Sequence, residues 1–73
     1  MPEIKYEIVK HLGVIGTSSS GWRTELNVIA WNDNPPKYDI RAWAPDHNKM
    51  GKGVTLTGEE LTTLYNLIGG TNG

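Results

Sequence analysis

The sequence predicts an α+β domain in which four β-strands are followed by one C-terminal helix. Before Thr57, polar and apolar residues alternate in several segments, as they do along strands. After Thr57 the apolar residues recur every three or four positions, which is the period of a helix. Clusters of Gly, Asn and Pro separate these segments and mark turns. With 73 residues the chain is expected to form one domain over residues 1–70, with residues 71–73 as a disordered tail.

The first strand is expected over residues 3–15, where Ile4 and Tyr6 share one phase of the alternation. The pattern breaks at residues 9–12. An inserted residue moves every later side chain to the other face, so this break predicts a β-bulge or a sharp bend. Residues 16–21 contain only Gly, Thr and Ser and are expected to form a flexible loop.

The second and third strands are expected over residues 22–31 and 37–44, and each carries an apolar phase and a polar phase. The apolar phase includes Leu26, Val28, Tyr38, Ile40 and Ala42. It needs a core, so the polar phase is expected to face solvent.

Residues 32–36 form the turn between these two strands, because Asn and Asp favour tight turns and Pro cannot join a ladder. A simple hairpin about this turn places Trp31 beside Lys37 and Asn27 beside Arg41. The two polar phases would then merge into one surface.

A short fourth strand is expected over residues 50–56, and a helix begins after it. Thr57 and Glu60 have the spacing of a capping box, in which each side chain bonds the other residue's backbone amide. Gly69 and Gly70 end the helix. One apolar stripe of the helix is expected to cover the sheet, and its widened edge would be left exposed in a monomer and could meet the helix of a second copy. The residues expected at this dimer interface are Leu61, Leu64, Tyr65, Leu67 and Ile68.

Composition narrows the function. The chain has no Cys and no spacing typical of metal ligands, so neither a disulfide framework nor a metal or other cofactor is expected. It also has no long apolar run and no secretory signal pattern, so a soluble cytoplasmic protein is expected, without a membrane partner. The net charge of −1 argues against a strongly basic nucleic-acid-binding protein. However, all seven Lys and Arg precede the helix, together with six of the eight acids.

The polar phase of the third strand carries Lys37, Arg41 and Trp43. Aromatic rings interleaved with cations are suited to stacking bases and neutralising phosphates of single strands. We therefore predict a nucleic-acid-binding surface with weak sequence preference. Its predicted residues are Lys5, Lys10, Trp22, Arg23, Trp31, Lys37, Arg41, Trp43 and Lys52.

Each of these residues also has a structural interpretation. Trp43 and Arg41 could be covered by a loop or a subunit, Trp31 at a strand end could cap a core, and Trp22 in the apolar phase favours a core position. Any single lysine could be an ordinary solvated cation. Their shared placement on strands and turns, away from the helix, favours a binding surface.

Three functions remain open. The first is a single-stranded DNA-binding module, with RNA as an alternative ligand because stacking tolerates both. The second is an adaptor that uses the same Trp-bearing face to hold a protein partner in transcription or replication. The third is a small enzyme built on Asp46 and His47. No arrangement typical of catalysis supports the third, so we expect no enzymatic activity.

The run Tyr38-Asp39-Ile40-Arg41, the aromatic Trp43, and Lys52-Gly53-Val54-Thr55-Leu56 before a capped helix resemble the signature of the positive-cofactor-four transcriptional coactivators. The order of these segments along nearly the whole chain is similar to the small bacterial members called YdbC. The loop before Lys52 is shorter than in the eukaryotic members, and their Ser- and Lys-rich arm is absent.

This resemblance implies a strongly curved, four-stranded antiparallel sheet followed by one helix. It also implies a homodimer joined through the helices and a nearby strand, and binding of single-stranded DNA along the curved sheets. Arg41 matches the arginine of the Asp-Ile-Arg motif and Lys52 the lysine of Lys-Gly, both of which contact DNA in the family. Trp43 falls at the family's aromatic position after that motif.

Overall fold

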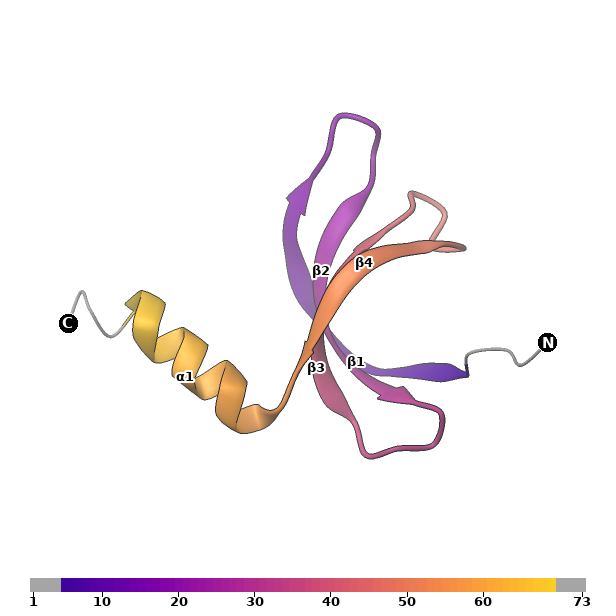
Figure 1. The fold of residues 1–73 in the computed structure, drawn as a ribbon. Coiled ribbons are helices and arrows are strands. Elements are labelled where there is room, and N and C mark those ends of the chain that lie inside the picture. Colours follow the sequence, from indigo (N-terminus) through magenta and orange to yellow (C-terminus); the bar gives the residue numbers. More distant parts are fainter. Residues whose placement is uncertain (1–4, 70–73) are drawn as a thin grey trace.

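The computed structural model describes residues 5–69, which form four strands followed by one helix. The elements are β1 (Tyr6–Thr17), β2 (Arg23–Trp31), β3 (Lys37–Trp43), β4 (Met50–Leu56) and α1 (Gly58–Gly69). The strands form one antiparallel sheet in the order β1-β2-β3-β4 (Figure 1). The predicted α+β architecture is confirmed. The predicted tail at residues 71–73 lies outside the described residues.

β1 is bent by irregular pairing with β2. The register shifts between Ile8 and Lys10, between His11 and Gly13, and again before Gly16. The first two shifts fall at the break in alternation predicted for residues 9–12. Extra residues in one strand increase its local twist and bend it, and Figure 1 shows a strongly curved sheet.

The pairing of β2 with β3 differs from the simple hairpin by two residues. The simple hairpin predicts Lys37 beside Trp31 and Arg41 beside Asn27. The observed partners are Lys37 with Ile29, Asp39 with Asn27, and Arg41 with Glu25. That part of the prediction is wrong, but a shift of two residues keeps every side chain on its predicted face.

The tight turn after β2 explains this register. The amide of Asn34 donates to the carbonyl of Trp31 at 2.8 Å. Asn32 and Asp33 between them have φ of 49° and 67°, the positive values that type I′ hairpin turns require. The turn is therefore complete before the two prolines, which extend the chain outside the ladder and delay the start of β3.

The two faces of the sheet carry different side chains. The concave face includes Tyr6, His11, Glu25, Asn27, Ile29, Trp31, Asp39, Arg41 and Trp43. The apolar face includes Leu26, Val28, Tyr38, Ile40 and Ala42. In Figure 1 the ends of the strands bend to one side and α1 lies off the other.

Burial of these faces is the reverse of the prediction. The largest fully buried side chains are Trp43, Ile29, Asn27 and Asp39, all on the concave face. The five residues named for the apolar face are only half-buried. The sheet bends toward the concave face, so side chains there cover one another. On the other side α1 approaches only β3 and β4, and none of its residues is buried.

The start of α1 matches its predicted cap. The amide of Thr57 donates to Glu60 Oε1 at 2.8 Å, and the amide of Glu60 donates to Thr57 Oγ1 at 3.1 Å. This reciprocal pair satisfies amides that have no partner inside a helix. Within residues 5–69, no helix has the length and apolar character needed to cross a bilayer.

Candidate nucleic-acid interface

Trp43 is sealed inside the concave face, so the prediction of an exposed ring is wrong. Its side chain has 0% exposure. The loop after β3 folds back on itself, because the His47 amide donates to the Ala44 carbonyl and the Ala44 amide to the Lys49 carbonyl. This places the His47 ring flat on Trp43, with centroids 4.1 Å apart and planes 3° apart. Trp43 cannot stack a base in this conformation.

Tyr6 joins the two indoles of the concave face. Its ring centroid lies 5.7 Å from those of both Trp31 and Trp43, in tilted geometry. Tyr6 remains 40% exposed and Trp31 is half-buried. The indole Nε1 atoms of Trp31 and Trp43 are buried with no acceptor among the described residues. Among the described residues of this face, the rings accessible from outside are therefore those of Tyr6, His11, His47 and part of Trp31.

Arg41 is an internal ion-pair partner more than a free cation. Its Nη2 lies 3.0 Å from Asp39 Oδ2 and its Nε donates to Asp39 Oδ1 at 3.1 Å. Its Nη1 donates to the Gly51 carbonyl at 3.0 Å, and its guanidinium carbon lies 5.1 Å above the Trp31 ring. Thr55 Oγ1 also donates to the fully buried Asp39. The Arg41 side chain, 17% exposed, holds that carboxylate in the sheet.

Gly53, the glycine of the Lys-Gly pair, is required by strand packing. A Cβ on Gly53 would collide with the carbonyl oxygen of Ile40 and come within 2.8 Å of the Arg41 Cβ. Gly53 lies directly opposite Arg41 in the β3–β4 ladder. Its missing side chain lets β4 approach the strand that carries the Asp39–Arg41 pair.

Glu25 lies close to both histidines, His11 and His47, which are 36 positions apart in the sequence. Glu25 Oε1 accepts from Asn27 Nδ2 at 3.0 Å and bonds His47 Nε2 at 3.1 Å. His11 Nδ1 lies 3.7 Å from the same oxygen and 2.6 Å from Asn27 Oδ1. Arg23 Nε lies 3.8 Å from the other carboxylate oxygen.

The pKa of Glu25 reflects two opposing causes. Burial raises the pKa of this carboxyl, since it disfavours the charged form. The hydrogen bonds from Asn27 and His47 and the charges of His47 and His11 act the other way and prevail, so the pKa of Glu25 lies below its ordinary value. The centre of the concave face therefore holds a stabilised buried carboxylate.

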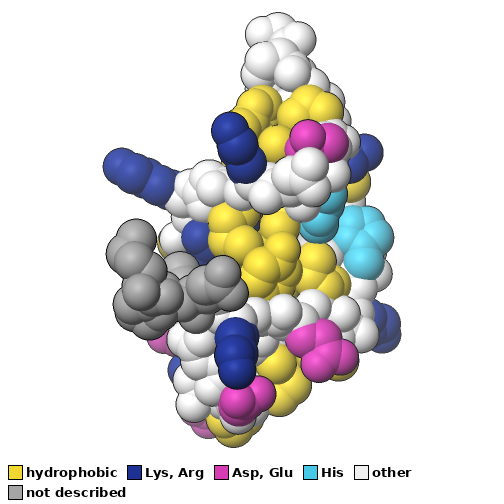
Figure 2. All heavy atoms as spheres, turned by 90° about the vertical axis from the view of Figure 1, so that its right-hand side faces the viewer, with side chains coloured by type: hydrophobic (Ala, Val, Ile, Leu, Met, Phe, Trp, Pro, Cys, Tyr) yellow, Lys and Arg dark blue, Asp and Glu magenta, His cyan; other side chains and the backbone are white. Residues whose placement is uncertain are grey.

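The predicted cations do not all share one face. Arg23 pairs with Trp43 and Lys37 with Ile29, which puts both on the side of the concave face. Lys10 pairs with Val28 of the apolar face, because the bulge at Val9 shifts its phase. Exposed lysines in the predicted site are Lys5, Lys10, Lys37 and Lys52. Figure 2, which views the concave side, shows hydrophobic side chains in the centre with Lys, Arg, Asp, Glu and His around them.

Trp22 belongs with the apolar face. A Cβ on Gly51 would lie 3.7 Å from the Trp22 ring and 3.6 Å from Ala42. Trp22 is half-buried there, so it is not brought together with Trp31 and Trp43. Its position in the apolar phase of the sequence indicates this placement.

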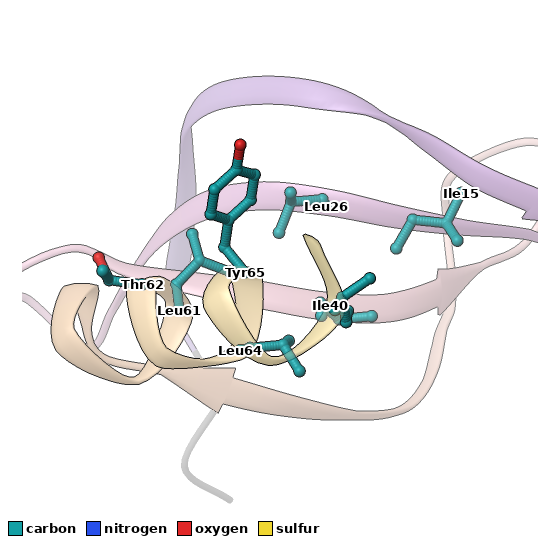
Figure 3. Close-up of a pocket in the computed structure, with 8 residues that line it drawn as sticks. Ile15, Leu26, Ile40, Leu61, Thr62, Leu64 and Tyr65 are labelled. Carbon is teal, nitrogen blue, oxygen red and sulfur yellow. The ribbon is translucent and has the colours of Figure 1, made fainter. Parts of the chain in front are cut away.

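An apolar groove lies between α1 and the sheet, on the face opposite Trp43 (Figure 3). It measures about 500 Å³ and is lined by Ile15, Leu26, Ile40, Leu61, Thr62, Leu64, Tyr65 and Ile68. Tyr65 is 71% exposed and Ile15 is exposed as well. Four of the five predicted interface residues, Leu61, Leu64, Tyr65 and Ile68, thus line this groove.

The suggested acid–base pair of Asp46 and His47 does not form. His47 bonds Glu25, whereas Asp46 accepts from the amide and the side chain of Asn48. Among residues 5–69, no three His, Asp or Glu side chains are grouped so as to hold a metal ion.

Sequence reasoning missed Tyr6, His11, Glu25 and Asn27 as parts of the site, and assigned His47 only to a catalytic alternative. Their signal is weak, since His11 follows a bulge and His47 lies in a loop. His47 has φ of 64°, a left-handed conformation that His adopts more readily than most residues. The curvature of the sheet and the folding of the loop after β3 together bring these side chains into contact.

Comparisons with known proteins identify the family of this chain. A protein of Treponema pallidum (strain Nichols), described as an uncharacterized protein, is 52% identical over 66 residues, which are 90% of this chain and 78% of the relative. The family model Transcriptional Coactivator p15 (PC4) matches residues 18–67, a span that covers β2, β3, β4 and most of α1. The narrower bacterial YdbC group stays a prediction. This chain belongs to the Transcriptional Coactivator p15 (PC4) family.

Proposed function

We propose that this protein binds single-stranded DNA on its concave face, without catalysis, in transcription or another process that exposes single strands. The observation that carries the proposal is the grouping of partly exposed rings on one curved face with cations at its margin (Figure 2). Membership of the PC4 family supports the same ligand. Bases would stack on the accessible rings, and phosphates would meet Arg23 and Lys37.

The placement of the cations sets the expected strength of binding. Arg41 already neutralises Asp39, and Arg23 lies near Glu25, so few positive charges remain for phosphates. With about two phosphate contacts on a single strand, the logarithm of affinity should fall with the logarithm of salt concentration with a slope of about −1.4. A highly basic protein would give a steeper slope.

Titration of the protein with fluorescent oligo-dT at two salt concentrations tests the proposal, with oligo-U and duplex DNA as competitors. We expect oligo-dT to bind and duplex to compete poorly. Lys37→Gln should weaken binding and flatten the salt slope, whereas Lys10→Gln, on the apolar side, should change neither. Stronger competition by oligo-U would redirect the proposal to RNA. Absence of binding to any of the three at low salt would refute it.

We also propose that the protein acts as a homodimer joined through the apolar groove. Tyr65 and Ile15 are exposed beside half-buried Leu26 and Ile40, and a small domain gains stability by covering such a surface. A second copy is the occupant suggested by the PC4 family match. Light scattering should give twice the chain mass, and a monomer at micromolar concentration would contradict this.

A further inference from the structure

His47, and not the predicted Trp43, presents an aromatic ring to solvent at this part of the concave face. Its ring covers Trp43 in an almost parallel stack, and its side chain is 35% exposed. One face of the imidazole is therefore in contact with the indole, and part of the ring remains accessible. A ring stacked on a buried ring is held in one plane, which is the preorganisation that base stacking needs.

Hydrogen bonding determines which nitrogen of His47 carries the proton. Glu25 Oε1 can only accept, since the lowered pKa keeps this carboxyl ionised, so His47 Nε2 must donate to it. The neutral ring then has its free lone pair on Nδ1, and a second proton would be taken up there. Protonation adds a positive charge to a ring that a carboxylate already holds in place.

The backbone also holds His47 in position. Its φ of 64° is a conformation that costs a residue with a Cβ about 1 kcal/mol or more, and the turn is closed by its amide bonding Ala44. The loop therefore maintains an unfavourable backbone conformation while it places the ring over Trp43. Such strained residues concentrate at functional sites.

We propose that His47 is the ring on which a base stacks, and that its protonation strengthens the binding of single-stranded DNA. The inference rests on the proposed function of the concave face. The charged groups around His47 are Glu25 and Arg23 from β2, His11 from β1, and Asp46 in its own loop. The Asp39–Arg41 pair of β3 shares the same face and is internally neutral.

Two variants separate stacking from structural support. His47→Phe keeps an aromatic ring over Trp43 and loses the bond to Glu25, whereas His47→Gln keeps a donor for Glu25 and loses the ring. At pH 8 we expect His47→Phe to bind oligo-dT within about twofold of the wild type and His47→Gln to bind about tenfold more weakly. Wild-type affinity should rise severalfold from pH 8 to pH 5.5, the range in which histidine gains charge.

That rise should be absent in His47→Phe and retained in His11→Gln, which removes the other histidine of the Glu25 group. Nuclear magnetic resonance of the wild type gives a second measurement that does not depend on how the variants fold. The ring protons of His47 should move upfield as oligo-dT is added, and those of His11 should move less.

Wild-type affinity in His47→Gln, equal weakening of both His47 variants, or unshifted His47 ring protons in the bound state would each overturn the inference. Failure of the wild type to bind oligo-dT anywhere between pH 5.5 and pH 8 would instead overturn the proposed function itself.

Discussion

At the scale of single residues, Asp39 and Arg41 show how this small sheet accommodates a charge in its interior. Asp39 has no exposed surface and receives bonds from Arg41 and Thr55. A buried carboxylate is tolerated only while its partners remain, because an unpaired buried charge is strongly destabilising. The same Arg41 lies over Trp31, so one side chain connects the polar and aromatic parts of the concave face.

Arg41→Ala should therefore lower the free energy of unfolding by about 3 kcal/mol, since it leaves Asp39 buried without its cation. Urea denaturation followed by tryptophan fluorescence measures this. Arg23→Ala is the matched control. The Arg23 side chain is 41% exposed, and its Nε lies 3.8 Å from Glu25 Oε2, which is too long for a hydrogen bond, so its loss should cost less than about 1 kcal/mol. Equal effects of the two substitutions would show that Arg41 has no special structural role.

Glu25 makes the stability of the folded protein depend on pH in the acidic range. Its pKa is lower in the folded protein than the ordinary 4.5, so its contribution is fully present above that value and is lost as the pH falls through the folded pKa. Wild-type stability in urea should decline below about pH 4.5, and Glu25→Gln should show a smaller decline. Glu7→Gln, at an exposed position of β1, should keep the wild-type profile. An unchanged profile in Glu25→Gln would contradict this account.

At the scale of elements, the stability of α1 depends on the capping of its first turn more than on packing against the sheet. It has no buried residue and approaches only the last two strands. Helices of this length are marginal in water without tertiary contacts, so the Thr57–Glu60 capping box carries unusual weight.

Thr57→Ala should cost about 1 kcal/mol, because it leaves an amide of the first turn without an acceptor. The loss should appear as faster amide hydrogen exchange along α1, with β2 and β3 little changed. Thr63→Ser, at an exposed position of the same helix and with a similar helix propensity, is the control and should leave exchange near the wild-type rate. Equal protection of α1 in the two variants would mean that the cap does not limit its stability.

At the scale of the whole molecule, the chain buries one face of its sheet and leaves the other open. The open face includes the groove that Tyr65 and Ile15 line, and Tyr65 is the most exposed of the large apolar residues described. Covering this groove with a second chain would link folding to association.

The thermal unfolding midpoint should consequently rise with protein concentration, by roughly 3 °C or more for each tenfold increase. Calorimetry from micromolar to millimolar protein measures this. Tyr65→Glu, which places a charge in the groove, should remove the dependence, and Glu59→Gln, at the start of α1 and outside this groove, should retain it. A midpoint independent of concentration in the wild type would rule out a folding-linked dimer.

Much of this fold could be predicted from the sequence, because local patterns determine it. Alternation located the strands, the break at residues 9–12 located two bulges, and Thr57 located the start of α1. What the pattern does not contain is curvature. Alternation assigns Trp43 to one face of the sheet, but the bend of β1 and the loop that carries His47 determine that this face closes over itself.

The saturation of the concave face has a consequence for discrimination. Asn27, Glu25, Asp39 and Arg41 direct most of their donors and acceptors at one another, at neighbouring side chains, or at the Gly51 carbonyl. The neighbouring side chains are those of His11, His47 and Thr55. A nucleobase edge placed on these groups would meet few unpaired donors or acceptors, so hydrogen bonding there would hardly distinguish the four bases. Any sequence preference would come from the size of the base and the flexibility of the strand. The affinities for a poly-purine and a poly-pyrimidine tract should therefore differ more than the affinities for two sequences that have the same composition in a different order.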